Sequence, residues 1–450
     1  MESLRIQARM ILATPERILC PGQVVIQHGK IRDCLARDFE KPDFDLGDAV
    51  IVPGLVNPHS HLEFSDLDAP LPPGRTFPEW ISAVVRYRLA RQLATEGQGA
   101  IGGAGQAAVK RGLTELASNG TALVGEIATH PWEPSWLTAS DYRNSRFSAG
   151  YFSRWAQHLP DFCALPSVVA QAEVLGLDAN KLAETMEWSQ RVLTEFDQER
   201  DVGCLVRSIG ISPHAPYSIN WDLAEAQVRK KLVGASVGSM HMAESLEELQ
   251  WLRSGDGPFA EVFDRLALPV PKNRIPILTL IQWLSSANRG LVIHGNYLCD
   301  DEMNELANHP HLSVVYCPRT HAHFQHATYP WQELKRRGIR VVLGTDSRAS
   351  NPDLNVWDEM VAARQMHPWV SPQVAWGAVT REAAQALGYG HQFGTIEVGK
   401  WANLQIIRQL NMSFEWQPTR VLEAVTMTHQ SEFTIKSLHK ELADLDPSKS

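Results

Sequence analysis

Cysteine is scarce in this chain, and its spacing excludes two common roles. The 450 residues contain six cysteines, and no two of them form a CxxC pair. A disulfide-stapled domain or a cysteine-based zinc site would need a denser or closer arrangement. We therefore expect scattered reduced thiols, as in a cytoplasmic protein.

Long hydrophobic runs and blocks of basic residues are also missing. No stretch approaches the ~20 apolar residues of a membrane-spanning helix, and the first segment, with Glu2 near its start, does not resemble a secretory signal. The net charge is −9, and acidic and basic residues are interspersed. These patterns argue against nucleic acid and membrane as partners and favour a small-molecule substrate. With 44% hydrophobic residues, the chain can bury a large core.

Short β-strands are predicted near both ends of the chain. Residues 4–12 and 23–35 are rich in Ile, Val and Leu, and His28-Gly29-Lys30 interrupts the second segment as a hairpin turn. Residues 394–400 and 402–407 predict another two-strand piece. We expect a composite sheet domain from 1–50 plus 393–410, a main unit at 51–392 and a C-terminal extension at 411–450.

Eight apolar runs of strand length lie in the main unit, and helix-period stretches separate many of them. This alternation predicts an α/β fold of the (β/α)8 barrel type, for which ~250 residues or more are usual. A doubly wound open sheet is the less favoured alternative, because no GxGxxG follows a strand. The expected strands are 50–57, 121–128, 146–152, 205–212, 236–242, 290–295, 312–317 and 340–345, and the expected helices are 78–94, 104–119, 180–197, 276–288, 301–309 and 331–338.

Residues able to bind a metal follow several of these strands, at the carboxyl ends where barrel enzymes build their active sites. The first strand runs into His59 and His61, whose spacing puts both imidazoles on one side. His241 ends the fifth strand and Asp346 the eighth. Each of these residues alone could be a core or surface side chain, and Asp346 could be a helix N-cap. Together they predict a metal site.

Three more side chains at these strand ends have the chemistry of a hydrolase. Glu244 stands three residues after His241, where a carboxylate that is not a ligand can pass on the proton of a metal-bound water. The alternative is an exposed glutamate at the start of a helix. His214 follows the fourth strand, and His294 lies at the end of the sixth.

These motifs, in this order, resemble the amidohydrolase superfamily and, within it, the cytosine-deaminase and chlorohydrolase-like branch. The segments that carry the resemblance are VPGLVNPHSH at 52–61, the His241 and Glu244 pair, His294 and GTDS at 344–347. The resemblance covers about residues 20–408 and implies a distorted TIM barrel with a small flanking β-sandwich made from the terminal segments. A homodimer is usual in the branch.

The resemblance implies a set of metal ligands, which are His59, His61, His241 and Asp346. Members with two metals carry a carboxylated lysine at the end of the fourth strand, whereas this strand ends near His214 and has no lysine there. One divalent metal is therefore expected. The ligand set suits Zn²⁺, which the Irving–Williams order favours, and also Fe²⁺.

The resemblance also implies the catalytic roles of a hydrolase that acts on non-peptide C–N bonds. Metal-activated hydroxide would attack an amidine-like ring carbon, Glu244 would protonate the adjacent ring nitrogen, and ammonia would leave. Asp346 and His294 would take and hold the proton of the water. His214 would lie near the substrate.

Three segments bear on the substrate: Glu63 after the HxH motif, residues 74–81 with the arginines behind them, and residues 316–324 after the seventh strand. They are most similar to the aminodeoxyfutalosine deaminases, whose substrate in menaquinone biosynthesis carries an adenine and a distal benzoate. Arg319 or Arg86 could pair with that carboxylate. The alternative is a solvated helix face at 86–91 and a core role for residues 77–80. The candidate substrate contacts are Glu63, Trp80, Arg86, His214, Arg319 and Ser347.

Other functions are compatible with the same motifs. One group comprises deaminases of adenosine, S-adenosylhomocysteine or guanine, and another comprises hydrolases of a triazine or a cyclic amide. A barrel that serves as a non-enzymatic scaffold is least favoured, because every expected ligand is present.

Overall fold

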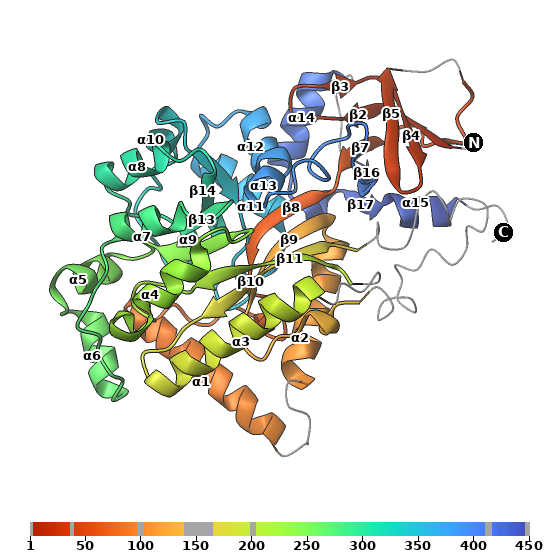
Figure 1. The fold of residues 1–450 in the computed structure, drawn as a ribbon. Coiled ribbons are helices and arrows are strands. Elements are labelled where there is room, and N and C mark those ends of the chain that lie inside the picture. The colour runs from red at the N-terminus through yellow and green to blue at the C-terminus, as the bar shows by residue number, and fades with distance from the viewer. Residues whose placement is uncertain are drawn as a thin grey trace.

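Eight parallel strands, paired in sequence order from β8 to β15, form the centre of the computed structural model (Figure 1). The structure describes residues 3–36, 40–96, 103–138, 165–198, 204–409 and 416–445. The first and last strands approach each other, since the Asp346 N–H donates to the His59 carbonyl oxygen at 3.2 Å. The sheet is a nearly closed barrel, which confirms the predicted fold class. Its strands are β8 (Leu55–Ser60), β9 (Thr121–Ala128), β10 (Ser167–Val174), β11 (Val206–Pro213), β12 (Gly238–Met242), β13 (Gly290–His294), β14 (Leu312–Tyr316) and β15 (Arg340–Leu343).

The third barrel strand does not lie where the sequence suggested. The expected strand at 146–152 falls outside the described residues, and the strand that pairs in parallel with both β9 and β11 is β10. Two polar residues, Gln171 and Glu173, interrupt its apolar run, and both are fully buried. The other seven barrel strands overlap the predicted ones.

Helices surround the barrel, and their ends follow ordinary capping rules. For example, α5 begins after Ser245, whose side chain accepts from the Glu248 N–H at 3.1 Å, and ends at Gly255 with φ of 74°. The six predicted helices match α1, α2, α3, α7, α8 and α10. The helices around the barrel are α1 (Phe77–Glu96), α2 (Gly103–Ser118), α3 (Ala179–Gln198), α4 (Trp221–Leu232), α5 (Leu246–Ser254), α6 (Pro258–Arg265), α7 (Ile277–Leu284), α8 (Asp300–Ala307), α9 (Pro318–His323), α10 (Trp331–Arg336), α11 (Val356–Met366), α12 (Pro372–Ala378) and α13 (Arg381–Ala386).

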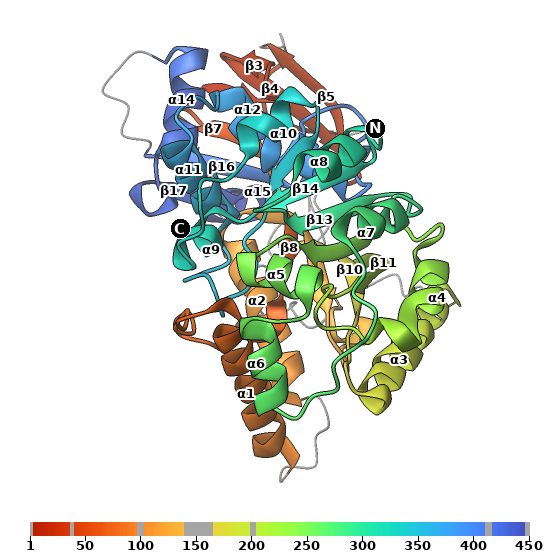
Figure 2. The ribbon, with the colours of Figure 1, turned by 90° about the vertical axis from the view of Figure 1, so that its left-hand side faces the viewer.

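Two mixed sheets lie together at one flank of the barrel (Figures 1 and 2). The order is β5-β4-β1-β6 in one and β17-β16-β7-β2-β3 in the other. The C-terminal strand β16 pairs antiparallel with β7, with Ile406 opposite Ile51, so distant parts of the chain meet as expected. The elements are β1 (Leu4–Ala8), β2 (Met10–Leu12), β3 (Ile18–Leu19), β4 (Gly22–Gln27), β5 (Lys30–Ala36), β6 (Phe44–Asp45), β7 (Val50–Pro53), β16 (Leu404–Arg408), β17 (Thr434–Ser437), α14 (Pro418–Met427) and α15 (Leu438–Asp444).

The segment 394–400 is not the strand that the sequence predicted. It forms turns, although its backbone still bonds to the N-terminal region: the Ile396 N–H donates to the Ala13 carbonyl and the Gly399 N–H to that of Ile31, both at 2.8 Å. Two glycines at positive φ, Gly394 and Gly399, account for the turns.

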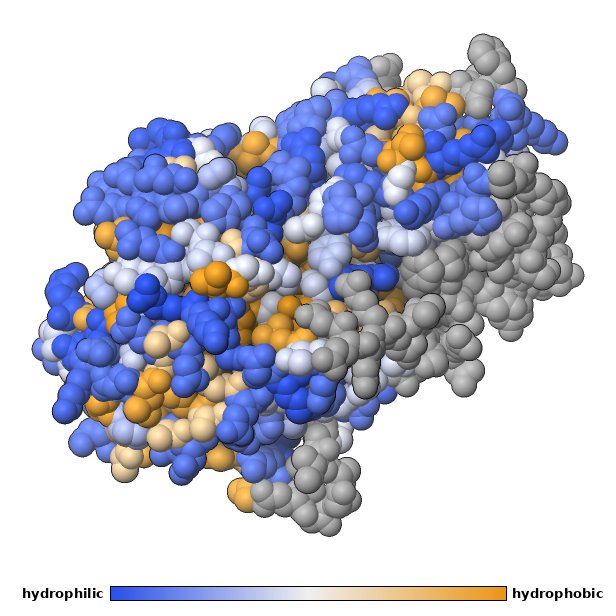
Figure 3. Space-filling view, viewed as in Figure 1, coloured by the Kyte–Doolittle hydropathy of each residue, from blue (hydrophilic) through white to orange (hydrophobic). Residues whose placement is uncertain are grey.

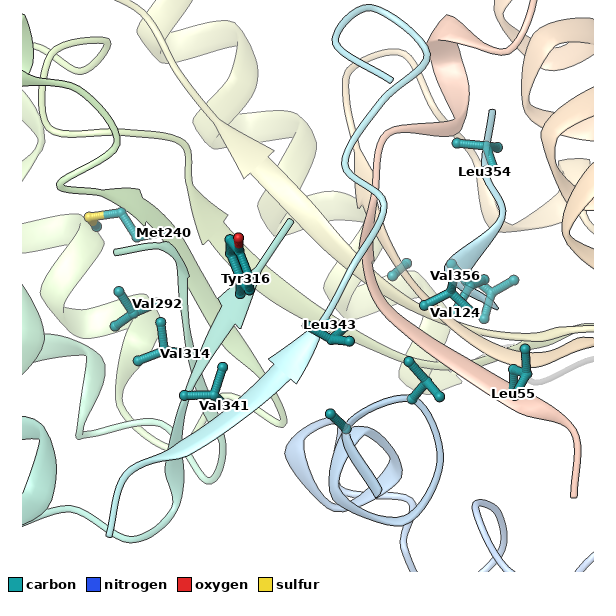
Figure 4. Packing of buried hydrophobic residues seen from close by; sticks show 14 of the residues in the cluster. Leu55, Val124, Met240, Val292, Val314, Tyr316, Val341, Leu343, Leu354 and Val356 are labelled. Carbon is teal, nitrogen blue, oxygen red and sulfur yellow. The ribbon is translucent and has the colours of Figure 1, made fainter. Parts of the chain in front are cut away.

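Alternate residues of the barrel strands enter two separate hydrophobic clusters. Figure 4 shows one cluster, in which Val292, Val314 and Leu343 lie among neighbours from several strands. The residues beside them in sequence, such as Ile293 and Val315, belong to the other cluster together with residues of α13. This alternation has the two-residue period of side chains along a β-strand. The polar side chains described below lie at the carboxyl ends of the strands.

Polar residues cover most of the face seen in Figure 3, and hydrophobic residues are scattered among them. Within the ranges that the structure describes, no helix has both the length and the apolar character needed to span a bilayer.

Candidate metal centre

Four buried side chains converge at the carboxyl ends of the barrel strands. His59 lies on β8, His61 directly after it, His241 on β12 and Asp346 after β15, and their potential ligand atoms all lie within 4.8 Å of one another. His59 Nε2 lies 3.4 Å and His61 Nε2 3.6 Å from Asp346 Oδ1. His61 Nε2 also lies 3.3 Å from His241 Nε2. The structure thus brings together all four predicted ligands.

The donor set of this site fits a divalent cation. Burial holds the pKa of His61 and of His241 well below the ordinary imidazole value, so each offers a lone pair. Burial by itself raises the pKa of Asp346, but the surrounding imidazoles outweigh it and lower that pKa, so the carboxylate is ionised. Both ring nitrogens of His59 are buried without a hydrogen-bond partner among the described residues. Imidazoles around one carboxylate are ligands that zinc and ferrous iron accept.

Further contacts fix the orientation of the ligands. His241 Nδ1 donates to the His214 carbonyl oxygen at 2.9 Å, and the Ser350 hydroxyl donates to Asp346 Oδ2 at 2.6 Å. Asn57 Nδ2 donates to Thr345 Oγ1 at 2.8 Å and so ties β8 to the end of β15. Such supporting bonds hold metal ligands in one rotamer and tautomer.

Glu244 and His294 lie together beside the four ligands. Glu244 Oε1 is 3.4 Å from His294 Nε2, and both side chains are at most 5% exposed. Burial, followed by the charges of Asp346 and Glu248, raises the pKa of Glu244 well above the ordinary carboxyl value. Burial lowers the pKa of His294. A protonated carboxyl group next to a neutral imidazole is suited to giving up a proton during a reaction.

Three residues at the strand ends adopt the left-handed backbone conformation, which is uncommon outside glycine. They are Ala243 with φ of 50°, His294 with 65° and Asp346 with 57°. Strained backbone of this kind is frequent where side chains are aimed into a functional site.

His214 lies next to the metal ligands without being one of the four. Its ring centroid is 4.9 Å from that of His241, and its Nδ1 is 2.7 Å from the Ser218 hydroxyl. Burial, together with the charge of Arg88, lowers the pKa of His214 to about 3. The imidazole is therefore neutral at the edge of the site.

The profile of the amidohydrolase family matches residues 50–430, a span that contains the whole site. This chain belongs to the amidohydrolase family. The match confirms the resemblance drawn from the motifs and the expectation of an enzyme.

Individual relatives and solved structures are similar over most of this amidohydrolase. The aminodeoxyfutalosine deaminase of Deinococcus radiodurans is 26% identical over 386 residues, covering 83% of this chain and 82% of that protein. The crystal structure of Helicobacter pylori aminofutalosine deaminase with methylthio-coformycin has a TM-score of 0.70 at 20% identity, covering 95% of this chain and 97% of that one. The zinc complex of Arthrobacter aurescens atrazine chlorohydrolase has a TM-score of 0.67 at 18% identity, covering 96% and 92%.

Glu63 of the amidohydrolase is held by two arginines of α1. Arg88 Nη2 lies 2.5 Å from Glu63 Oε1 and Arg91 Nη2 lies 2.8 Å from Glu63 Oε2. Arg86 is exposed instead. The alternative of a solvated helix face therefore describes Arg86 but not the two arginines that turn toward the barrel.

Trp80 belongs to an aromatic cluster above the carboxyl ends of the strands. It is 8% exposed, stacks with Phe77 at a centroid distance of 5.7 Å and donates through Nε1 to the Ala349 carbonyl at 3.3 Å. Phe324, which follows α9, meets Trp80 edge-on at 5.0 Å. The cluster joins segments after three different strands into one cover.

The structure places Arg319 and Ser347 in contacts within the protein. Arg319 Nε lies 2.7 Å from Glu359 Oε1, and its Nη2 lies 2.7 Å from Asp353 Oδ1. The Ser347 hydroxyl accepts from the Ala349 N–H at 3.2 Å, and the residue is 2% exposed. Arg319 would have to break one of these ion pairs before its guanidinium group could pair with a substrate.

Sequence reasoning missed several acidic residues around the site. Glu126 on β9 and Glu173 on β10 lie near the carboxyl ends of their strands and are fully buried. Glu248 on α5 accepts from the N–H groups of Ala243 at 3.1 Å and Glu244 at 2.8 Å, and so fixes the turn that carries Glu244. The available signal was an acid inside an otherwise apolar run, as in LVGEIA and VVAQAEV.

Proposed function

We propose that this amidohydrolase deaminates an adenine-type compound, with aminodeoxyfutalosine of menaquinone biosynthesis as the first candidate. The observation that carries the proposal is the Glu244 and His294 pair, 3.4 Å apart and buried beside the metal site. Deamination needs a proton donor for the ring nitrogen next to the carbon that is attacked, and this pair supplies a carboxyl group whose pKa is raised by burial.

A Zn²⁺ ion is the proposed cofactor. His59, His61, His241 and Asp346 would hold it, and the zinc complex of the similar chlorohydrolase supports this choice. When bound, the metal supplies Lewis-acid chemistry that lowers the pKa of a water molecule from ~15.7 toward ~7.

The residues of the chain then carry the proton transfers and the positioning. Glu244 gives its proton to the ring nitrogen, and burial of Glu244 favours the protonated form before the reaction. Asp346 accepts the proton of the attacking water, and His294 holds the oxygen in place through Nε2. His214, a neutral imidazole beside His241, packs against the substrate ring. The buried positions of Glu244, His294 and Asp346 keep bulk water away from the reaction.

The adenine-type substrate is supported by the Deinococcus relative and by the Helicobacter structure, which holds methylthio-coformycin. The benzoate of aminodeoxyfutalosine would need a cation. Arg86, which is exposed on α1, and Arg319 beside α11 are the candidates. Glu63, Trp80 and Ser347 stay in the proposal as residues that shape the pocket.

The test is ammonia release by zinc-loaded protein from aminodeoxyfutalosine, adenosine, S-adenosylhomocysteine and guanine, with atrazine as a fifth compound. We expect the highest kcat/KM for an adenine compound and almost none for the Glu244→Gln variant. A preparation with one zinc per chain that releases chloride from atrazine and no ammonia from any adenine compound would overturn the proposal in favour of a chlorohydrolase, the reading supported by the Arthrobacter structure.

A further inference from the structure

Glu173 has a buried oxygen that nothing in the described protein satisfies. The residue lies at the carboxyl end of β10, and its side chain is 0% exposed. Oε2 accepts from the Thr129 hydroxyl at 2.8 Å, whereas Oε1 has no hydrogen-bond partner among the described residues. A buried polar atom without a partner is costly, so such an oxygen indicates a donor that arrives from outside the chain.

Arg88, which lies next to Glu173, has a buried hydrogen-bond donor without a partner among the described residues. Its Nη2 lies 2.5 Å from Glu63 Oε1 and 3.7 Å from Glu173 Oε2, but its buried Nε has no partner within the described ranges. An unpaired acceptor and an unpaired donor therefore belong to two neighbouring side chains. A hydroxyl group can donate to the first and accept from the second. A carboxylate could not donate to Glu173, and an ammonium group could not accept from Arg88.

The imidazole of His214 lies between Glu173 and the metal ligand His241. Glu173 Oε1 is 3.9 Å from His214 Nε2, which is too long for a hydrogen bond. The ring of His214 is in turn 4.9 Å from that of the ligand His241. A substrate whose reacting ring lies over the metal and against His214 would carry its next group to Glu173 and Arg88.

Burial alone does not leave a glutamate at a strand end with an oxygen that lacks a hydrogen-bond partner. Glu126, on the neighbouring strand β9, is equally buried, and both of its oxygens accept from the Leu62 N–H, at 3.0 and 3.3 Å. Glu126 is thus satisfied by the backbone. Among these two strand-end glutamates, only Glu173 has an oxygen left for a ligand.

We propose that Glu173 and Arg88 form a subsite that binds the secondary hydroxyls of the ribosyl group of the substrate, with Glu173 accepting and Arg88 donating. This rests on the proposed function, because it takes an adenine nucleoside as the substrate class. The subsite makes the enzyme select a nucleoside rather than a free base or a deoxygenated analogue, since the analogue leaves both buried atoms unpaired.

The experiment compares adenosine with its dideoxy analogue, which lacks both secondary hydroxyls, on the zinc-loaded protein and its Glu173→Gln variant. At pH 8, above the pKa of about 7 of Glu173, we expect the unaltered protein to prefer adenosine by roughly 10–100-fold in kcat/KM, the range for a hydrogen bond to a charged group. Glu173→Gln replaces the charged acceptor by a neutral amide, whose oxygen accepts more weakly and whose NH2 group cannot accept, so it should remove most of this preference. Glu187→Gln, an exposed glutamate on α3, is the matched control and should keep it.

Each outcome decides the proposal. If the unaltered protein treats the two nucleosides alike, or if Glu173→Gln keeps the full preference, the subsite is wrong while deamination stands. If the zinc-loaded protein deaminates no adenine compound, the proposed function fails and takes the subsite with it. Should Glu173→Gln fail to fold, the comparison of the two nucleosides on the unaltered protein still gives the answer, because it needs no substitution.

Discussion

The carbonyl oxygen of His214 accepts two hydrogen bonds from His241, one from the backbone N–H and one from Nδ1–H, both at 2.9 Å. The side-chain bond fixes the tautomer in which Nε2 carries the lone pair, and it aims that nitrogen at His61 and Asp346. His214, which we propose to contact the substrate through its side chain, thus also orients a metal ligand through its backbone. Substituting the His214 side chain leaves this backbone acceptor in place, so metal binding and substrate binding can be separated experimentally.

Removing the metal should abolish activity and lower thermal stability. The ligands are buried, and an ion that binds only the folded chain adds to the free energy of unfolding. Dialysis against a chelator should therefore lower the midpoint of thermal unfolding, and Zn²⁺ should restore both midpoint and turnover. His61→Ala should behave like the chelated protein, whereas His309→Ala, outside the site, should not. Full turnover at about zero metal per chain would contradict the proposed site.

Glu244→Gln should lower kcat by roughly 10²- to 10⁴-fold, the usual contribution of general acid–base catalysis. The metal content should stay at one ion per chain, because Glu244 is not among the four ligands. Steady-state kinetics and metal analysis on the same preparation check both expectations. Glu261→Gln, an exposed glutamate on α6, serves as the control. A Gln variant with unaltered kcat would show that another group delivers the proton.

Arg319→Met should destabilise the fold by about 3–5 kcal/mol, the cost of breaking a buried ion pair from one side. Glu359 is completely buried and would lose its cation, although Asp353 at the other end is more exposed. Urea unfolding measures the loss, and the double variant with Glu359→Gln should recover part of it. If Arg319→Met instead keeps its stability and raises KM, the arginine contacts the substrate.

The stability of the protein should depend on pH through Glu173. Burial raises the pKa of Glu173 from 4.5 to about 7, against the lowering effect of Arg88, while the charge of Glu63 adds to the rise and Lys181 opposes it. Between these two values the folded chain keeps a proton that the unfolded chain releases, so this contribution to stability is present below pH 4.5 and is lost as the pH rises through about 7.

Glu173→Gln has no such proton. Its stability relative to the unaltered protein should therefore increase from about pH 5 to about pH 8, by at least ~1.4 kcal/mol, the free energy of one pKa unit. Urea unfolding at the two pH values, with Glu187→Gln as the control, gives the measurement. A constant difference between Glu173→Gln and the unaltered protein would show that the carboxyl group has an ordinary pKa.

Periodicity located seven of the eight barrel strands and missed β10, where polar residues interrupt the apolar run. The run at 167–174 contains Gln171 and Glu173, and these polar residues hide a strand that is buried along its whole length. Glu173 is accommodated because its Oε2 bonds to the Thr129 hydroxyl and its Oε1 lies toward His214, whereas the side-chain amide of Gln171 has no hydrogen-bond partner among the described residues. A periodic pattern identifies a strand only where its buried residues are apolar, and two buried polar residues are enough to break it.

The metal ligands of the candidate site could be predicted from the sequence, whereas the contacts between distant side chains around them could not. His59, His61, His241 and Asp346 stand at strand ends, so the topology of a barrel brings them together without further information. The contacts of Arg88 with Glu63 and Glu173 depend on how α1 folds back over the barrel, across 25 and 85 positions of sequence. No local pattern carries such a pairing.

The contact between β8 and the segment after β15 has a consequence for the order in which the metal site is assembled during protein synthesis. His59 and His61 are made before the other two ligands, and the carboxylate that completes their site comes 285 residues after His61, on the segment bonded to the His59 carbonyl. A growing chain therefore carries two of the imidazoles until His241 is made, and then three without the carboxylate for the next 105 residues. The complete set of four ligands, and the contact that closes the barrel between His59 and Asp346, therefore both depend on one segment that is made long after the first two ligands.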